Sequence, residues 1–211
     1  VVYNPILTCL CYEAKKRNIS YICGLEMLVG QAVSAIEFFT NKSVDSSLIQ
    51  KISKDIFFDK QNIVLIGMPS CGKSSLGKKL SKELGYDYID IDKKIVEKTN
   101  KTIPQIFKES GEAGFRKIES EVCLEVSKCN HTVISCGGGI IKNEINMKAL
   151  ALNGFIIYIK RDVEKLLVGN GRPLSKDKET LRKMMIEREP LYIKYSDETN
   201  NHFNSCCIND E

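Results

Sequence analysis

The chain has 211 residues, of which 43% are hydrophobic and 27% charged, values that are ordinary for a soluble globular domain with an additional segment. No run of roughly 18 or more apolar residues predicts a membrane-spanning helix, and the net charge of +4 supports a nucleic-acid partner only weakly and fits an anionic small molecule equally well. The nine cysteines include no C-x-x-C pair and are joined by only two histidines, which argues against zinc and predicts reduced thiols in the cytoplasm.

Residues 1–58 are predicted to be mainly helical. Asn4 and Pro5 suit the N-cap and first position of a helix, because apolar residues follow them at helical spacing. Tyr21–Cys23 could form a short strand, and Gly24 precedes a long amphipathic helix. A third helix is expected from the spacing of Leu48, Ile52 and Ile56.

Residues 62–211 predict an α/β fold, a parallel sheet with helices on both faces, because short apolar runs alternate with helical segments. A helix with a leucine face is expected to end at Gly85, and residues 93–128 are predicted to be helical with breaks near Pro104 and Gly111. The expected strands are Ile63–Ile66, Tyr88–Ile89, Thr132–Ser135 and Phe155–Ile159.

The stretch GMPSCGKSS, residues 67–75, matches the phosphate-binding pattern G-x-x-x-x-G-K-[ST] and lies between an expected strand and an expected helix. Backbone N–H groups at such a helix start surround a β-phosphate. Lys73 would reach the β- and γ-phosphates, the Ser74 hydroxyl would bind Mg²⁺, and Ser75 could bond the α-phosphate. The predicted ATP-binding residues in this loop are Pro69, Ser70, Cys71, Gly72, Lys73, Ser74 and Ser75.

The remaining motifs narrow the class of nucleotide-binding protein. The chain has no N-K-x-D motif for guanine, which argues against a GTPase. The third expected strand ends in SCGGG instead of the acidic pair that is usual in motor and AAA-type ATPases. The class that still fits the sequence is a small-molecule kinase, which has a substrate-binding insert and a lid.

Two aspartates follow the second expected strand. As residues i and i+2 of an extended segment, Asp90 and Asp92 would lie on the same side of it. One carboxylate could then face the metal and the other the acceptor.

Two arginines are candidates for binding an anionic acceptor. Arg116 lies three residues before Glu119 on an expected helix, so the two can pair and orient the guanidinium group. Arg188 could be held by Glu187 or Glu189. Arginine binds a carboxylate through two parallel hydrogen bonds, which lysine cannot do.

With these motifs in order after a phosphate loop, residues 62–195 resemble the shikimate kinase family. The segments that carry the resemblance are YIDIDKKIVE, GFRKIES, the glycines at 137–139, GRPL and EREPLY. The resemblance implies ATP and Mg²⁺ as cofactors and shikimate as acceptor, phosphorylated at its 3-hydroxyl. A gluconate-type kinase is the alternative within small-metabolite kinases.

The resemblance also assigns roles to residues. Asp90 would help to hold the metal shell together with Ser74, and Asp92 would bind the acceptor hydroxyl and act as the base. Arg172 lies in a polar segment typical of a lid and would neutralise the γ-phosphate, which makes Lys73, Asp92 and Arg172 the expected catalytic residues. The expected shikimate-binding residues are Asp92, Arg116, Gly137, Gly138, Gly139 and Arg188.

The chain departs from the family pattern at two places. Leu166 and Leu167 stand where the family usually has an arginine that stacks on adenine, and a short polar tail follows Tyr195 in place of a last strand, a loop and a helix. These departures motivate a second hypothesis, a catalytically impaired nucleotide-binding module.

Residues 1–41 resemble the C-terminal end of shikimate dehydrogenase. Tyr3 and Gln31 match positions that touch shikimate in that family, and Gly24 and Met27 match positions near its nicotinamide. Because the catalytic lysine and aspartate of that family and a G-x-G-x-x-G loop are missing from this sequence, we predict no dehydrogenase activity for it. We expect a fragment of a longer polypeptide, in which an upstream dehydrogenase domain is covalently linked to the kinase.

Overall fold

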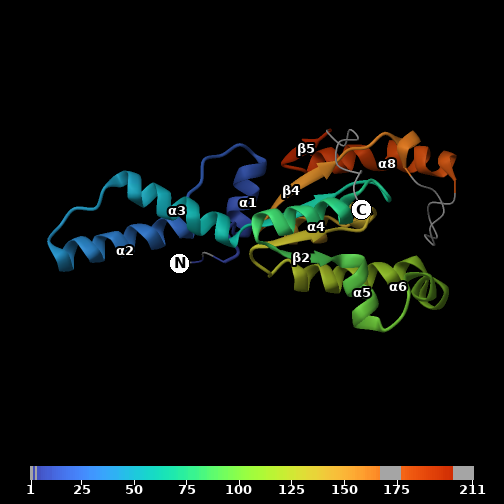
Figure 1. The fold of residues 1–211 in the computed structure, drawn as a ribbon, viewed down its shortest axis with the longest axis horizontal. Helices are drawn as coiled ribbons and strands as arrows, with labels where there is room; N and C mark the ends of the chain where they lie inside the picture. The colour runs from blue at the N-terminus through green and yellow to red at the C-terminus, as the bar shows by residue number, and fades with distance from the viewer. Residues whose placement is uncertain (1, 3, 167–176, 202–211) are drawn as a thin grey trace.

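The computed structural model describes residue 2, residues 4–166 and residues 177–201. Its centre is a five-stranded sheet, in which every pair of neighbouring strands is parallel and the order is β2-β3-β1-β4-β5 (Figure 1). The strands are β1 Asn62–Ile66, β2 Asp87–Asp90, β3 Thr132–Ser135, β4 Gly154–Ile159 and β5 Glu198–Asn200.

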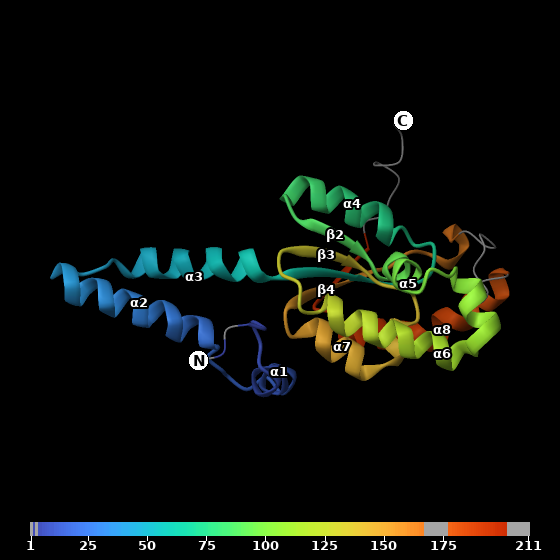
Figure 2. The same ribbon diagram turned by 90° about the horizontal axis from the view of Figure 1, so that it is seen from below.

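Helices cover both faces of this sheet. Figure 2 shows α4 on one side and α6, α7 and α8 on the other, so the predicted α/β class with a flanked parallel sheet is confirmed. The helices of this region are α4 Lys73–Leu84, α5 Ile91–Thr99, α6 Ile103–Val126, α7 Glu144–Ala151 and α8 Lys178–Tyr195, with short 3₁₀ turns η1 Ile140–Lys142 and η2 Val163–Lys165.

The order of the strands places β1 in the middle of the sheet, where both of its edges are paired. Val64, Leu65 and Ile66 have no exposed surface, as the run of apolar residues predicts for a strand buried on both faces. β3 and β4 flank β1, and β2 lies beyond β3 with Asp90 paired to Ser135. The carboxyl ends of β1, β3 and β2 therefore open on the same edge, where ligands bind in sheets of this kind.

Three helices precede the sheet, α1 Cys9–Lys16, α2 Gly24–Thr40 and α3 Ser46–Lys60. The last two agree with prediction, but α1 begins later than Asn4 and Pro5 suggested, and Thr8 is its N-cap. The reason is a tertiary contact. The N–H of Leu7 donates to the carbonyl of Leu152 and that of Ile6 donates to Asn153 Oδ1, so these backbone groups bond to the region of the sheet and do not start a helix.

The strand suggested for Tyr21–Cys23 is wrong, since these described residues form an irregular connection between α1 and α2. Ile22 is 75% exposed there and no neighbouring strand pairs with the segment. A short apolar run becomes a strand only where another strand can accept its backbone hydrogen bonds.

The hairpin of α2 and α3 extends away from the sheet (Figure 1). Leu25, Val29 and Val33 form its own small core, separate from that of the sheet. Phe38 and Phe39 are each 82% exposed near the far end of α2. In the part of the chain that the structure describes, no helix is both long and apolar enough to cross a bilayer.

The fifth strand, β5, was not expected from the sequence. It pairs with β4 at the edge of the sheet, and Asp197 prepares the pairing, because its carboxylate accepts from the N–H of Ile156 and its own N–H donates to the carbonyl of that residue. Lys15 of α1 bonds the same carboxylate at 2.6 Å. The polar segment after Tyr195 thus completes the sheet.

Candidate active site

The phosphate loop connects the carboxyl end of β1 to α4. Gly67 has a φ of 147°, and a Cβ there would lie 2.6 Å from the carbonyl oxygen of Ile159, so only glycine fits. Gly72, with a φ of 101°, is the N-cap of α4. Pro69, Ser70 and Cys71 lie between these glycines, and Ser75 is an exposed residue in the first turn of the helix.

Lys73 is only 7% exposed and its ammonium group lies over the loop. Its Nζ donates to the carbonyl oxygens of Gly67 at 3.0 Å and Met68 at 2.8 Å, and its distance to Cys71 Sγ is 3.6 Å. A cation held at the N-terminus of a helix, beside the backbone N–H groups of that first turn, is suited to binding phosphate oxygens.

Ser74 and Asp90 form a pair of oxygen donors beside this loop. Ser74 Oγ lies 2.8 Å from Asp90 Oδ2, and the Tyr88 hydroxyl donates to the same oxygen at 3.3 Å. Burial raises the pKa of Tyr88, and the charge of Asp90 adds to the rise, so the phenol stays a donor. A hydroxyl and a carboxylate are ligands that Mg²⁺ accepts, so the pair fits this metal.

The predicted relationship between Asp90 and Asp92 is wrong. Asp90 ends β2 and caps α5, accepting from the N–H of Lys93, whereas Asp92 already belongs to the first turn of that helix. The chain stops being extended between the two, so they do not share one side of a strand. Asp92 instead approaches Gly137, where a Cβ would lie 2.8 Å from its Oδ1.

The three glycines that follow β3 form the floor of the site, because each one faces a different candidate residue. A Cβ on Gly137 would meet Asp92, and one on Gly138 would lie 2.8 Å from Cδ of Pro69. A Cβ on Gly139 would overlap the guanidinium group of Arg116. The absence of side chains here therefore brings the phosphate loop, α5 and α6 together around one turn.

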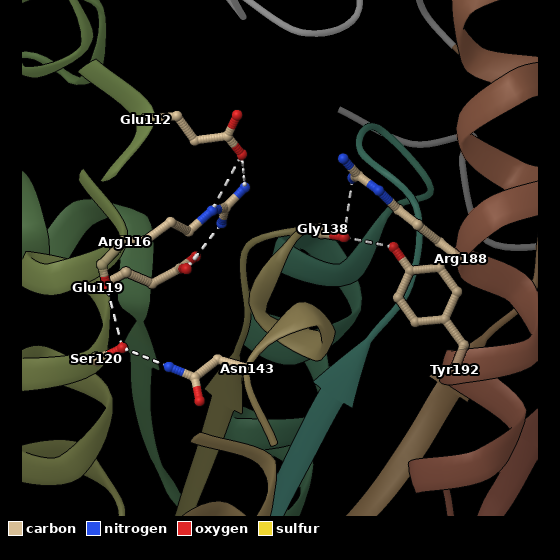
Figure 3. Close-up of polar contacts among 8 residues, drawn as sticks. All are labelled: Glu112, Arg116, Glu119, Ser120, Gly138, Asn143, Arg188 and Tyr192. Carbon is tan, nitrogen blue, oxygen red and sulfur yellow. Dashed lines mark hydrogen bonds and ion pairs between the residues drawn. The ribbon is translucent and has the colours of Figure 1, made fainter. Parts of the chain in front are cut away.

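Arg116 lies on α6 between two carboxylates, which Figure 3 shows. Its Nη1 donates to Glu119 Oε2 at 2.7 Å, as the spacing predicted, and its Nη2 donates to Glu112 Oε1 at 3.1 Å. Burial alone lowers the pKa of Arg116, but the ion pairs with Glu119 and Glu112 outweigh it and the net change is upward.

The main chain of Arg116 is also fixed. Its carbonyl accepts from Ser120 Oγ, which in turn accepts from Asn143 Nδ2 at the start of α7 (Figure 3). These bonds tie the turn of α6 that carries the arginine to the segment that follows the glycines.

Arg188 approaches the glycine turn from the other side, on α8. It is 4% exposed, and its Nη1 donates to the carbonyl oxygen of Gly138 at 3.0 Å. Figure 3 shows the guanidinium groups of Arg116 and Arg188 directed toward the same space from opposite helices. Two cations converging in this way can hold one carboxylate.

The expected partners of Arg188 are wrong. Glu187 pairs with Lys142 at 2.8 Å and Glu189 pairs with Lys160 at 2.7 Å. On a helix, the neighbours of residue 188 in sequence point to other faces, and Tyr192, four positions later, shares the buried face of Arg188. The hydroxyl of Tyr192 donates to the Gly138 carbonyl at 2.6 Å.

Sequence reasoning missed Glu112 and Tyr192. Each lies four residues from a predicted site arginine, Glu112 before Arg116 and Tyr192 after Arg188, and this i, i+4 spacing on expected helices was the available signal. Arg172 and Leu167 lie outside the described residues. Leu166 is 2% exposed and packs in the main core.

Comparisons with known proteins agree on one family. The family model for shikimate kinase matches residues 69–205, whereas the sequence resemblance covers residues 62–195, so the match begins seven residues later and ends ten residues later. A shikimate kinase of Clostridium botulinum strain Eklund 17B is 47% identical over 139 residues, which are 64% of this chain and 84% of that protein. A shikimate kinase of Clostridium beijerinckii is 44% identical over 137 residues, 63% of this chain and 80% of that protein.

A solved structure is similar across most of the same region. The structure of shikimate kinase from Acinetobacter baumannii in complex with shikimate superposes with a TM-score of 0.68 and 32% identity. The match covers 72% of this chain and 88% of that one.

Proposed function

The chain belongs to the shikimate kinase family, whose members are ATP-dependent phosphotransferases, and we propose that it converts shikimate and ATP to shikimate 3-phosphate and ADP. The observation that carries the proposal is the meeting of a phosphate loop, an aspartate and two arginines around Gly137–Gly139. Shikimate has one carboxylate and three hydroxyls. Two arginines for the carboxylate and one aspartate for a hydroxyl suit such an acceptor.

The proposed transfer is in line. The 3-hydroxyl oxygen of shikimate forms a bond to the γ-phosphorus, the bond from that phosphorus to the β–γ bridging oxygen breaks, and ADP leaves. Asp92 accepts the proton of the hydroxyl. Lys73 and Arg172 neutralise the charge on the transferred group, while Arg116 and Arg188 hold the carboxylate, so positioning and charge stabilisation carry the catalysis.

Mg²⁺ is part of the proposal, held by Ser74 and Asp90. Within the described residues there is no group of three or more His, Cys, Asp or Glu side chains that could form an all-protein site. Phosphate oxygens and waters would therefore fill the other positions, as is usual for this ion. When bound, it would neutralise charge on the β- and γ-phosphates.

The experiment that tests this function is a coupled ADP-release assay over a panel of hydroxy acids, with and without Mg²⁺. We expect turnover with shikimate and ATP that depends on the metal. Phosphorylation of gluconate in place of shikimate would favour a gluconate-type kinase. Binding of ATP without turnover of any acid would favour the impaired nucleotide-binding module.

A second proposal concerns the segment before the sheet. We propose that residues 1–58 are a separate unit from the kinase domain of residues 62–211, and that residues 1–41 derive from the end of a shikimate dehydrogenase. Support comes from the matches at Gln31, Gly24 and Met27, whereas Tyr3 lies outside the described residues. The exposed Phe38 and Phe39 fit a segment that packs against a further domain.

The wider arrangement can be tested on the natural protein. A covalently linked dehydrogenase predicts a mass well above that of 211 residues and shikimate-dependent NADP reduction by the purified protein. If the protein isolated from its natural source had only this length and lacked that activity, the linked dehydrogenase would be contradicted.

We also propose a cytoplasmic location, supported by the seven described cysteines, all of which are free thiols.

A further inference from the structure

Tyr192 is fully buried on α8, one helical turn after Arg188. The two side chains share an acceptor: the Gly138 carbonyl receives the Tyr192 hydroxyl at 2.6 Å and Arg188 Nη1 at 3.0 Å (Figure 3). A carbonyl oxygen has two lone pairs, so both donors can be accommodated at once. The carbonyl thus connects the tyrosine to the arginine.

The ring of Tyr192 is held firmly. It stacks on the ring of Tyr158 in β4, with centroids 4.9 Å apart and an angle of 16° between the planes. Burial raises the pKa of Tyr192 well above its ordinary value, although the nearby charge of Arg188 opposes the rise, so the hydroxyl remains a neutral donor. Its bond therefore fixes the Gly138 carbonyl against the central sheet.

Arg188 has few other bonds to define its orientation. Among the described residues its Nε is buried without a hydrogen-bond partner and its Nη1 donates to the Gly138 carbonyl, while its guanidinium group also lies close to the Tyr192 hydroxyl, whose pKa it lowers through a side-chain hydrogen bond. A planar fork must be oriented to bind a carboxylate through two parallel bonds. The Gly138 carbonyl and the Tyr192 hydroxyl beside it therefore determine how the fork is presented.

We propose that Tyr192 is a positioning residue for the acceptor's carboxylate: its hydroxyl holds the Gly138 carbonyl, which in turn orients Arg188. The proposal rests on the proposed function, since it assumes that Arg188 binds that carboxylate. Tyr192 itself does not touch the reacting atoms.

The test is Tyr192→Phe, which removes the hydroxyl and keeps the ring stack. Loss of one neutral hydrogen bond corresponds to a rise in the KM and Kd for shikimate of about three- to tenfold. The kcat and the KM for ATP should change by less than about twofold. Binding is measured by calorimetry well below the melting temperatures, so lost affinity is separated from lost stability.

Tyr158→Phe is the matched control, because it removes the hydroxyl of the stacked partner. That hydroxyl lies 3.9 Å from Met185 Sδ, and among the described residues the side chains that donate to the Gly138 carbonyl are those of Arg188 and Tyr192. We expect shikimate affinity within about twofold of the wild type. An equal loss in both variants would mean that the tyrosine pair acts only through packing, and would overturn the proposal.

A double-mutant cycle separates positioning from a general effect. In an Arg188→Ala background, Tyr192→Phe should weaken shikimate binding little further, because the group that it orients is gone. Additive losses, or an unchanged Kd in the single Tyr192→Phe variant, would overturn the positioning role. If the wild type bound no shikimate, the proposed function itself would fail, and this outcome is distinct from a failure at Tyr192.

Discussion

Arg116 and Glu119 form an ion pair in which the carboxylate is almost completely buried, with 2% of its side chain exposed against 22% for the arginine. The arginine Nη1 lies 2.7 Å from Glu119 Oε2. The pair orients one edge of the guanidinium group, but the buried carboxylate carries a desolvation cost.

This cost predicts a dependence of stability on pH. Burial raises the pKa of Glu119 above its ordinary value of 4.5, with Arg116 opposing the rise and Asp92 adding to it. The folded state then binds the proton more tightly than the unfolded state, so this contribution is greatest below pH 4.5 and is lost as pH rises through the raised pKa. In the Glu119→Gln variant, residue 119 has no ionisable carboxyl group, so this variant serves as the reference without the pH-dependent contribution.

Thermal unfolding of both proteins measures the effect. The melting temperature of the wild type relative to Glu119→Gln should fall as the pH is raised from 4.5. A constant difference would show that the attraction of Arg116 and the cost of burial cancel, and one that grows with pH would show that Arg116 stabilises the ionised carboxylate more than burial destabilises it; either result would contradict the prediction.

The contact between Glu112 and Arg116 predicts a gain of affinity on mutation. Glu112 Oε1 lies near Nη2 and Nε, the edge of the guanidinium fork that Glu119 leaves available. A ligand carboxylate using that edge displaces Glu112, whose side chain is half exposed. Glu112→Gln should therefore lower the KM for shikimate by about two- to threefold, the size expected of an exposed ion pair.

Glu109→Gln is the control for this prediction. Glu109 is equally exposed on α6 but pairs with Lys101, away from the arginine. Its variant should keep the wild-type KM. A higher KM in Glu112→Gln would mean that the glutamate supports Arg116 and does not compete with the ligand.

The Ser74–Asp90 pair predicts a change in metal requirement. Asp90→Asn keeps an N-cap for α5 but removes the negative charge beside Ser74. The Mg²⁺ concentration for half-maximal activity should rise by about fivefold or more. Asp87→Asn, at an exposed position of the same strand, should leave it unchanged, and equal requirements in the two variants would remove Asp90 from the metal site.

The close approach of Gly137 to Asp92 predicts a loss of rate. In Gly137→Ala the new Cβ would lie 2.8 Å from Asp92 Oδ1, so the carboxylate must shift. Displacing a catalytic group by about 1 Å can cost on the order of a hundredfold, and we expect kcat to fall at least tenfold. Gly30→Ala in α2, which meets nothing within 4 Å, should leave kcat unaffected. An unaltered kcat in Gly137→Ala would argue against Asp92 as the base.

The parts of the fold that were predictable are those governed by local chemistry. The apolar run of β1, the loop ending at Gly72 and the stop of α4 at Gly85 follow from side-chain periodicity and from glycine conformation. The edge strand β5 was not predictable, because its three polar residues carry no apolar signal and its pairing comes from backbone bonds to β4.

The candidate residues of the site were predictable as a set, but their mutual geometry was not. The identities of Lys73, Asp92 and Arg116 came from motifs, whereas the helical turn between Asp90 and Asp92 depends on where α5 starts. The partner of Arg188 was missed because the Gly138 carbonyl is fifty residues away in the chain. Every residue has a backbone carbonyl, so the pattern of side chains in the sequence does not indicate which carbonyl accepts a given hydrogen bond.

The most direct test of the central claim is identification of the product by phosphorus–proton correlation NMR after incubation of the chain with ATP, Mg²⁺ and shikimate. The account predicts one new phosphate ester coupled to the proton on carbon 3 of shikimate, formed with one equivalent of ADP and absent with Lys73→Ala. Release of ADP with inorganic phosphate alone, or a phosphate on another hydroxyl, would contradict it.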